Sequence, residues 1–277
     1  CGLMGSGIAE VCARAGLEVV VQEPDQKLIE AGRARIERSL QRAQKSKKMT
    51  AEEGASALRL IANTTDLAEF AGCDLVVEAI VENQAAKIEV FKKLDAIVTR
   101  EDALLTSNTS SIPIMSLAVQ TGRASQVCGL HFFNPVPVLD LVELVPSLMT
   151  SEETVDRLEA FASEVLGKQT IRAKDRAGFI VNALLVPYLL SAIRMAESGF
   201  ATPEHIDAGM VKGCNHPMGP LALTDLIGLD TTLAIAECLY DEFKEPQYAA
   251  PSLLCRMVEA GLLGRKSGKG FYDYSKR

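Results

Sequence analysis

The sequence predicts an α/β fold, with a doubly wound, mostly parallel sheet over residues 1–175 and an all-helical domain over residues 176–277. Two observations lead to this prediction. Up to residue 173, short apolar stretches alternate with longer helical patterns, as parallel strands alternate with crossover helices. Beyond a turn at residues 175–179 the strand pattern stops, and the remaining residues, rich in Leu, Ile and Met, predict helices.

The composition limits the classes of partner. The 277 residues are 48% hydrophobic, enough for packed cores, and carry a net charge of −7. Such an acidic protein is not expected to bind nucleic acid or an anionic membrane surface, and no apolar run reaches the roughly 20 residues of a membrane-spanning helix. Seven scattered cysteines, never spaced C-x-x-C, favour reduced thiols in the cytoplasm and argue against disulfides and a metal site.

The chain opens on a glycine-rich turn, followed by an expected helix over residues 8–15 and a buried strand over residues 17–23. Such glycines let the backbone approach a pyrophosphate at a helix N-terminus. The acid that ends the strand lies 18 residues after Gly5, near the distance expected for binding ribose hydroxyls, and it favours NAD over NADP. A glycine turn with a solvated acid is the alternative. The expected dinucleotide contacts are Gly2, Leu3, Met4, Gly5 and Glu23.

A strand is missing ahead of this turn. In a doubly wound dinucleotide-binding sheet, the first strand lies in the middle, and without it two interior edges would be unpaired. The sequence starts at Cys1, with neither that strand nor an initiator Met. We therefore expect that the natural chain begins upstream.

Residues 25–48 predict a long helix with a basic stripe. Arg35, Arg38, Arg42 and Lys45 follow one another at steps of three, four and three, so they share one face, and Lys47 and Lys48 extend the cluster. This stripe could hold a phosphorylated ligand. An ordinary solvated helix face is the alternative.

Further strands are expected at residues 60–65, 74–80, 103–107 and 127–130. Between them the pattern predicts helices that begin near residues 50, 66, 85 and 112. Glu82 and Asn83 follow one strand and residues 108–111 (Asn-Thr-Ser-Ser) another, at the carboxyl edge where open sheets bind ligands. The small polar residues could be either a helix cap or hydrogen-bond donors to a ligand.

The stretch over residues 129–145 holds His131, one of three histidines in the chain. The two prolines that follow each withhold a backbone N–H, so residues 134–137 predict a rigid loop. The chain then resumes as a short apolar strand that carries Glu143. A His at a strand end, with a carboxylate able to return to it, is typical of an oriented general base. A buried structural His beside a surface Glu is the alternative.

The first domain is expected to end with a helix over residues 152–166 and a strand over residues 168–173. The second is expected to begin with a long apolar helix over residues 180–198, kinked by Pro187, and to continue with at least three more helices. An apolar helical domain of this kind often forms a homodimer, and packing against the first domain is the alternative.

Seven motifs make the chain resemble the L-3-hydroxyacyl-CoA dehydrogenase family, particularly the bacterial-type 3-hydroxybutyryl-CoA dehydrogenases. The resemblance covers essentially the whole chain. The motifs are GLMGSGIAE (2–10), DLVVEAIVEN (74–83), SNTSSIPI (107–114), GLHFFNPVPVLDLVELV (129–145), GFIVNALLVPYL (178–189), HPMGPLALTDLIGLD (216–230) and GRKSGKGFY (264–272).

The resemblance implies a role for each matching residue. His131 would be the catalytic base, Glu143 its orienting partner, and Ser110, Asn134 and Asn182 polar residues at the substrate and nicotinamide. Glu23 stands where the family more often has Asp. Further cofactor contacts would be Glu82, Lys87 and Lys266, with Ser110 and Asn134; contacts to coenzyme A would be Ser39 and either Lys45 or Lys47, because the matching position is Ser46.

The implied reaction is the NAD-dependent oxidation of a (S)-3-hydroxyacyl-CoA, of short chain such as 3-hydroxybutyryl-CoA, to the 3-oxoacyl-CoA, and its reverse, in fatty acid or butanoate metabolism. Two alternatives stay open: a dehydrogenase of a free hydroxy acid or sugar acid on the same scaffold, and a non-enzymatic NAD-binding dimer. Neutralising the lysines of the basic helix should raise KM for a CoA ester and leave KM for a free acid unaffected, which distinguishes the first alternative. The pairing of His131 with Glu143 argues against the second.

Overall fold

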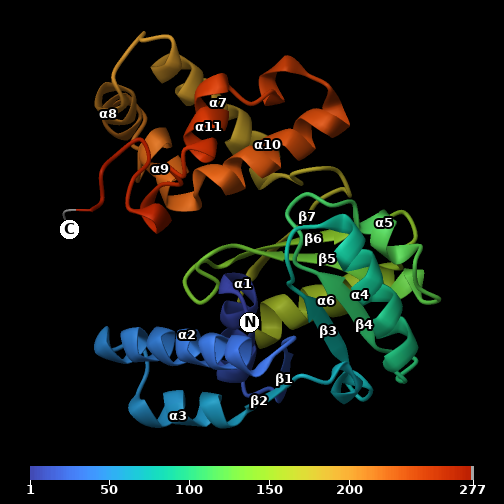
Figure 1. Cartoon of the computed structure of the whole chain (residues 1–277). Helices are drawn as coiled ribbons and strands as arrows, with labels where there is room; N and C mark the ends of the chain where they lie inside the picture. Colours follow the sequence, from blue (N-terminus) through green and yellow to red (C-terminus); the bar gives the residue numbers. More distant parts are fainter. Residues whose placement is uncertain (276–277) are drawn as a thin grey trace. The chain divides into compact units, whose positions relative to one another are not determined.

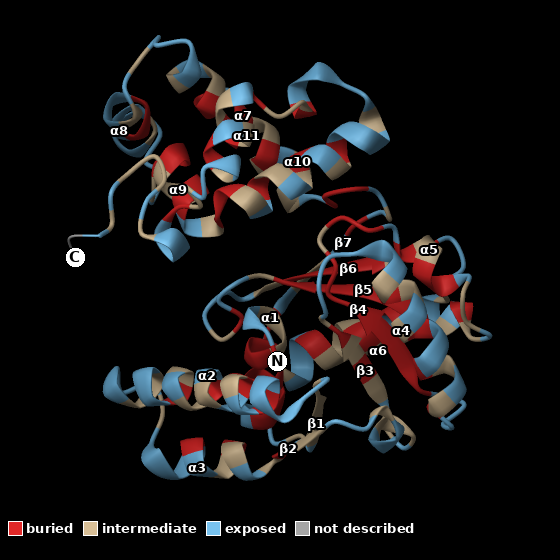
Figure 2. Ribbon diagram, viewed as in Figure 1, coloured by how far each residue is buried: buried red, intermediate tan, exposed pale blue. Residues whose placement is uncertain are grey.

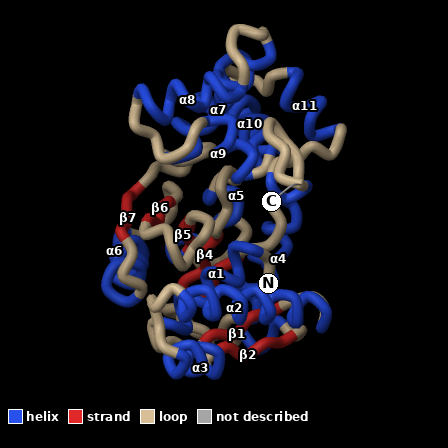
Figure 3. The backbone as a smooth tube through the Cα atoms, turned by 90° about the vertical axis from the view of Figure 1, so that its left-hand side faces the viewer, coloured by secondary structure: helices blue, strands red, loops and turns tan. Residues whose placement is uncertain are grey.

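The computed structural model describes residues 1–275, which divide into two compact units at Asp175 and Arg176 (Figure 1). The first unit contains the strands, and residues 176–275 are built from helices and loops (Figure 3). None of the helices in the described residues has the length and apolarity required to cross a bilayer.

The strands of the first unit form two sheets. In the smaller one, β1 (Val19–Gln22) lies parallel to β2 (Ile61–Thr64). The larger one has the order β3-β4-β5-β6-β7 and is parallel except between β5 and β6. Its strands are β3 (Leu75–Glu78), β4 (Leu104–Ser107), β5 (Val127–Phe132), β6 (Leu141–Pro146) and β7 (Gln169–Arg172).

A mostly parallel sheet is therefore confirmed, with β5–β6 as its one antiparallel pair among the described strands. The loop between these two strands is too short for a parallel crossover, which needs about a dozen residues or more, so β6 must run back along β5. Strands β1 and β3 are not paired with each other. The strand expected ahead of Cys1 lies outside the sequence and stays a prediction.

Helices cover both faces of the larger sheet (Figure 1). Ile8, Val11 and Cys12 share a core with Leu130, Leu144 and Leu158, which places the first and sixth helices on one face. Gly129 faces the other side, where a side chain would collide with Ile114. The α-helices of this unit are α1 (Leu3–Arg14), α2 (Gln26–Lys45), α3 (Ala51–Arg59), α4 (Gln84–Ile97), α5 (Ile114–Ala118) and α6 (Glu152–Ala160).

Polar side chains fix where these helices begin. Asp25, Asn83 and Ser151 each accept a backbone N–H from the first turn of α2, α4 and α6, respectively. Thr50 and Glu53 form a complete capping box on α3. These contacts satisfy backbone donors that a helix leaves unpaired at its N-terminus.

Several expected boundaries are wrong. The helix expected near residue 66 is a 3₁₀ turn (Leu67–Phe70), and α6 passes into a π-helical segment (Phe161–Val165). The helix α1 begins at Leu3, so the glycine turn is also the first helical turn. Strand β5 extends to Phe132, because antiparallel pairing with β6 continues that far, and His131 therefore lies within the strand.

The second unit has its own core. Residues such as Leu190, Ile193, Leu221, Leu229 and Leu239 are completely buried there. Figure 2 shows buried residues on the inner sides of these helices and along the central strands of the first unit. The α-helices are α7 (Val181–Glu197), which contains Pro187, α8 (Pro203–Gly213), α9 (Pro220–Ile227), α10 (Leu229–Phe243) and α11 (Ser252–Glu259).

Candidate active site

His131 and Glu143 face one another across two neighbouring strands. They are register partners in the antiparallel pair β5–β6, so both side chains emerge on the same face of the sheet. His131 Nδ1 lies 2.7 Å from Glu143 Oε2. Glu143 is completely buried and His131 is 4% exposed. The pairing fixes the orientation of the imidazole ring.

Ser110 contacts the opposite nitrogen of the same ring. Its Oγ lies 3.1 Å from His131 Nε2. An ionised carboxylate can only accept a hydrogen bond, so this pairing favours the tautomer in which Nδ1–H donates to Glu143. In that tautomer the lone pair of Nε2 lies beside the Ser110 hydroxyl. Phe133 packs against the ring with a centroid distance of 4.6 Å. This is the geometry of an oriented general base.

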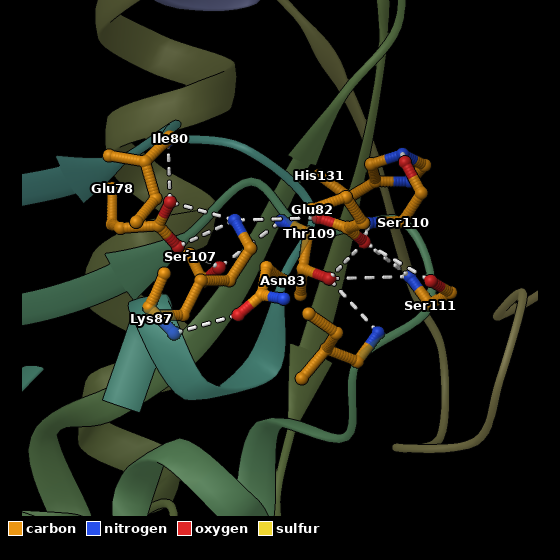
Figure 4. A network of polar contacts seen from close by, with 12 residues as sticks. Glu78, Ile80, Glu82, Asn83, Lys87, Ser107, Thr109, Ser110, Ser111 and His131 are labelled. Atoms are coloured by element: carbon orange, nitrogen blue, oxygen red, sulfur yellow. Dashed lines mark hydrogen bonds and ion pairs between the residues drawn. The ribbon is translucent and has the colours of Figure 1, made fainter. Parts of the chain in front are cut away.

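The serine loop, residues 108–111, is held at both ends. Asn108 Oδ1 accepts the Phe132 backbone N–H at 2.8 Å, which joins the loop to β5. Glu82 Oε1 accepts the Thr109 hydroxyl at 2.5 Å and the Ser110 and Ser111 backbone N–H groups at 2.9 and 3.2 Å (Figure 4). The loop is thus a set of donors bound to a carboxylate of the same unit.

The charge of Glu82 suits this role. Burial by itself would raise the pKa of Glu82. The ammonium of Lys87 and the hydrogen bonds from the serine loop act in the opposite direction, and together they lower the pKa of Glu82 below its usual range. The carboxylate is therefore ionised at neutral pH, when its acceptor strength is greatest.

Lys87 is deeply buried, which the sequence analysis does not anticipate. Its side chain is 1% exposed, and its Nζ lies 2.7 and 2.9 Å from the two oxygens of Glu78 and 3.4 Å from Glu82 Oε2. The family resemblance implies that Glu82 and Lys87 contact the cofactor. In the structure they bind each other, and their contact with the dinucleotide stays a prediction.

Asn134 lies on the loop between β5 and β6 and is exposed. The buried Lys168 supports this loop, because its Nζ donates to the carbonyls of Val136 and Leu139, each at 2.8 Å. Gly7 of α1 packs so closely on the loop that a β-carbon there would come within 2.9 Å of Val136. The loop that follows His131 is therefore fixed from two sides.

A pocket of about 280 Å³ lies between α1, α2 and residues 134–137. Half-buried Ser39, which the sequence analysis assigns to coenzyme A, is in its lining together with Asn134. The basic lining residues are Arg35, Arg38 and Arg42. Lys45 and Lys47, the other assigned residues, are exposed and lie outside the lining. The arginines of the predicted stripe thus face a hollow, whereas its lysines do not.

The first unit has a place for a dinucleotide pyrophosphate. Gly2 is the N-cap of α1, no side chain caps this helix, and a β-carbon on Gly2 would meet no atom within 4 Å. Open space at an uncapped helix N-terminus fits a diphosphate. Leu3, Met4 and Gly5 form the first turn. Glu23 follows the end of β1 and is half-buried.

Two assigned residues belong to the second unit. Asn182 is half-buried in the first turn of α7. Lys266 is exposed and donates to Asp230 at 2.6 Å. Their roles stay predictions. Within residues 1–275, no three His, Cys, Asp or Glu side chains gather as metal ligands would.

Sequence reasoning missed two buried residues next to the site, Glu78 and Lys168. Each carries a formal charge in a segment that the sequence analysis treats only as a strand. The signal was available for Glu78, because a carboxylate in a strand buried on both faces requires a partner. For Lys168 no local signal exists, since its partners are backbone carbonyls about 30 residues away.

The fold and the paired His131 and Glu143 define a class, that of two-domain NAD-dependent oxidoreductases. Residues 1–176 match the family described as 3-hydroxyacyl-CoA dehydrogenase, NAD binding domain, and residues 178–274 match its C-terminal domain. The chain belongs to the 3-hydroxyacyl-CoA dehydrogenase family.

Curated relatives match over nearly the full length. A 3-hydroxybutyryl-CoA dehydrogenase of Mycobacterium tuberculosis is 60% identical over 273 residues, which cover 99% of this chain and 96% of the relative. The human mitochondrial hydroxyacyl-coenzyme A dehydrogenase is 44% identical and is covered to 88%, against 99% of this chain.

Solved structures agree. The crystal structure of M. tuberculosis FadB2, at 60% identity, superposes with a TM-score of 0.98 and covers 99% of this chain and 96% of its own. The (S)-3-hydroxybutyryl-CoA dehydrogenase PaaH1 of Ralstonia eutropha, at 46% identity, gives a TM-score of 0.92 with the same coverage.

Proposed function

We propose that this protein oxidises (S)-3-hydroxyacyl-CoA thioesters, with 3-hydroxybutyryl-CoA as the preferred short-chain substrate, to 3-oxoacyl-CoA with NAD, and catalyses the reverse reaction. The observation that carries the proposal is the placement of His131 between Glu143 and Ser110. The names of the relatives supply the substrate class. The reaction belongs to fatty acid or butanoate metabolism.

His131 would act as the general base. Its Nε2 accepts the proton of the 3-hydroxyl group, and the Glu143 carboxylate at 2.7 Å stabilises the imidazolium that forms. The Ser110 hydroxyl, 3.1 Å from the same nitrogen, would hold the reacting oxygen there. Asn134, on the loop after β5, would bind the thioester carbonyl. Bound NAD would supply the acceptor for the hydride of C3.

The first experiment follows the absorbance of reduced nicotinamide with acetoacetyl-CoA, using NADH and NADPH in parallel. We expect consumption of NADH and little of NADPH. His131→Gln should lower kcat by about 10²–10⁴-fold, because the base is removed, with NADH affinity unchanged. His205→Gln, at an exposed position in the second unit, is the matched control. A His131 variant with normal turnover would remove His131 from the mechanism.

The basic pocket supports a CoA thioester over a free acid. Arg38 and Arg42 lie in the lining beside Ser39, and guanidinium groups bind phosphates well. Arg38→Gln with Arg42→Gln should raise KM for the CoA ester roughly tenfold or more and leave kcat unchanged. Arg33→Gln, on the same helix and outside the lining, is the control.

The result separates three cases. An unchanged KM would favour a free hydroxy acid or sugar acid as substrate. A larger effect from neutralising Lys45, Lys47 and Lys48 than from the arginines would move the phosphate contacts to the lysines. NADH binding without turnover of any of these compounds would favour a non-enzymatic NAD-binding protein.

The oligomeric state and the cellular compartment are also proposed. We propose a homodimer formed through the second unit, where Leu184 and Phe200 are 72% and 79% exposed. Seven scattered cysteines, odd in number and never spaced C-x-x-C, support a reducing compartment such as the cytoplasm. Sedimentation of the purified protein at twice the monomer mass would agree with the dimer.

A further inference from the structure

Glu78, the last residue of β3, carries a buried carboxylate. Glu78 is 4% exposed, and its two oxygens receive four hydrogen bonds. Lys87 Nζ donates to both, the Ile80 backbone N–H donates at 2.6 Å, and the Ser107 hydroxyl donates at 2.6 Å (Figure 4). Glu78 therefore fixes the ammonium of Lys87 in position.

From Lys87 the contacts continue to the catalytic histidine. Lys87 Nζ lies 3.4 Å from Glu82 Oε2, and the other oxygen of Glu82 takes the donors of the serine loop. The Ser110 hydroxyl then lies 3.1 Å from His131 Nε2. A chain of alternating charges, Glu78, Lys87 and Glu82, thus leads from the end of β3 to the atom proposed to accept the proton.

Stability alone does not require this arrangement. Placing an ammonium and a carboxylate in the interior costs several kcal/mol per ion, and a well-packed apolar pair is often as stable or more stable. What an apolar pair could not do is keep a cation beside Glu82. That cation holds one oxygen of Glu82 while the other remains on the serine loop.

We propose that Glu78 is a positioning residue: through Lys87 and Glu82 it holds Ser110 at His131. The inference rests on the proposed function for its kinetic consequence and on the geometry alone for its structural one. Glu78 touches neither His131 nor Ser110, so its effect on the reaction is indirect. Besides the route through Lys87 and Glu82, a shorter contact runs through Ser107, whose hydroxyl donates to Glu78 and accepts the Thr109 backbone N–H at 3.2 Å.

A double-mutant cycle tests the route through Glu82. Glu78→Gln should lower kcat by about 10–100-fold, with smaller changes in the KM values for NADH and acetoacetyl-CoA, because Ser110 is displaced while the glycine turn and the arginines of the pocket remain in place. Glu82→Gln should lower kcat similarly. In the double variant the Glu78 change should lower kcat much less than it does alone, because the route through Glu82 is already broken and only the contact through Ser107 remains.

Asp95→Asn is the matched control. Asp95 pairs with Arg123 in the same unit, partly buried and away from the serine loop. This variant should be less stable and keep kcat, which shows that reduced stability by itself does not lower turnover. Multiplicative effects of Glu78→Gln and Glu82→Gln would overturn the proposal, as would a Glu78 variant with normal kcat.

A second measurement does not depend on turnover. The ¹⁵N resonance of His131 Nε2, assigned by comparison with His131→Gln, reports the hydrogen bond from Ser110. We expect Glu78→Gln to shift this resonance and Asp95→Asn to leave it in place. If the wild-type protein were inactive on acyl-CoA and the shift still occurred, the proposed function would fail and the positioning role would stand. An unmoved resonance in folded Glu78→Gln would overturn the positioning role.

Discussion

At the scale of single residues, strand register decides whether His131 can act as a base. His131 and Glu143 are separated by 12 residues and are direct partners across β5 and β6. Successive residues of a strand point to opposite faces, so a slip of one residue would move Glu143 to the other side of the sheet. The catalytic geometry therefore depends on the loop that fixes this register.

Glu143→Gln tests the orienting role of the carboxylate. An amide can offer an N–H to Nδ1 and so stabilise the wrong tautomer, with the proton on Nε2, and it cannot balance the charge of the imidazolium. We expect kcat to fall by roughly 10²-fold or more, while NADH affinity and the circular dichroism spectrum stay unchanged. Glu153→Gln, on the exposed side of α6, is the control. Full activity would make Glu143 a structural residue only.

The sequence identifies the residues that carry the proposed chemistry, but not the buried residues that hold them in place. His131, Ser110 and Glu143 could be proposed from residue type, the proline loop and family motifs, and the structure brings these three together. The supports of the site depend on the folded chain. Lys168 donates to backbone carbonyls about 30 residues away. Glu78 has near partners in Ile80 and Lys87, but its contact with the Ser107 hydroxyl spans 29 residues.

At the scale of elements, the loop between β5 and β6 needs donors from elsewhere. Pro135 and Pro137 supply no N–H, and the carbonyls of Val136 and Leu139 are bound by Lys168 Nζ. Burial lowers the pKa of Lys168. The ammonium satisfies the buried carbonyl of Val136 and the partly buried carbonyl of Leu139.

Lys168→Met should loosen the loop. The variant leaves two carbonyls without their donor, so we expect a loss of about 2–4 kcal/mol in the free energy of unfolding. Because the same loop carries Asn134 and sets the register of β5 and β6, kcat should also fall. Urea denaturation and steady-state kinetics measure the two effects. Lys174→Met, at an exposed position near the end of the first unit, is the control. Equal stability of the two variants would contradict the role of Lys168.

Element boundaries show where local patterns lose their predictive value. Most strands and helices of the first unit follow the short apolar stretches and the helical patterns of the sequence. The end of β5 does not, because its last residues, including His131, are ordered by pairing with β6 rather than by their own propensity. The π-helical segment (Phe161–Val165) after α6 is likewise invisible in a pattern that fits a helix of ordinary period.

At the scale of the whole molecule, the fold class follows from the sequence because many weak local signals agree. Alternating strands and helices predict a parallel sheet, and the loss of strand patterns predicts the helical second part. The separation of β1–β2 from the larger sheet matches the two unpaired interior edges expected from the sequence.

The cysteines report on the integrity of the folded chain. Cys12 and Cys128 are buried on the face of the sheet covered by α1 and α6, and burial raises the pKa of each thiol to about 12. Because the thiolate is the reactive form, almost none is present at pH 8, and access is blocked as well. Cys214 is exposed in the second unit.

We therefore expect a thiol-specific disulfide reagent at pH 8 to modify Cys214 within minutes and to leave Cys12 and Cys128 unmodified until denaturant is added. Peptide mass mapping after timed quenching measures each site. Cys214→Ser should remove the fast phase, and Cys128→Ser should not. Modification of Cys128 at the rate of Cys214 in native buffer would mean that the sheet opens on that time scale. The tight register of β5 with β6, on which the pairing of His131 and Glu143 depends, would then not persist in solution.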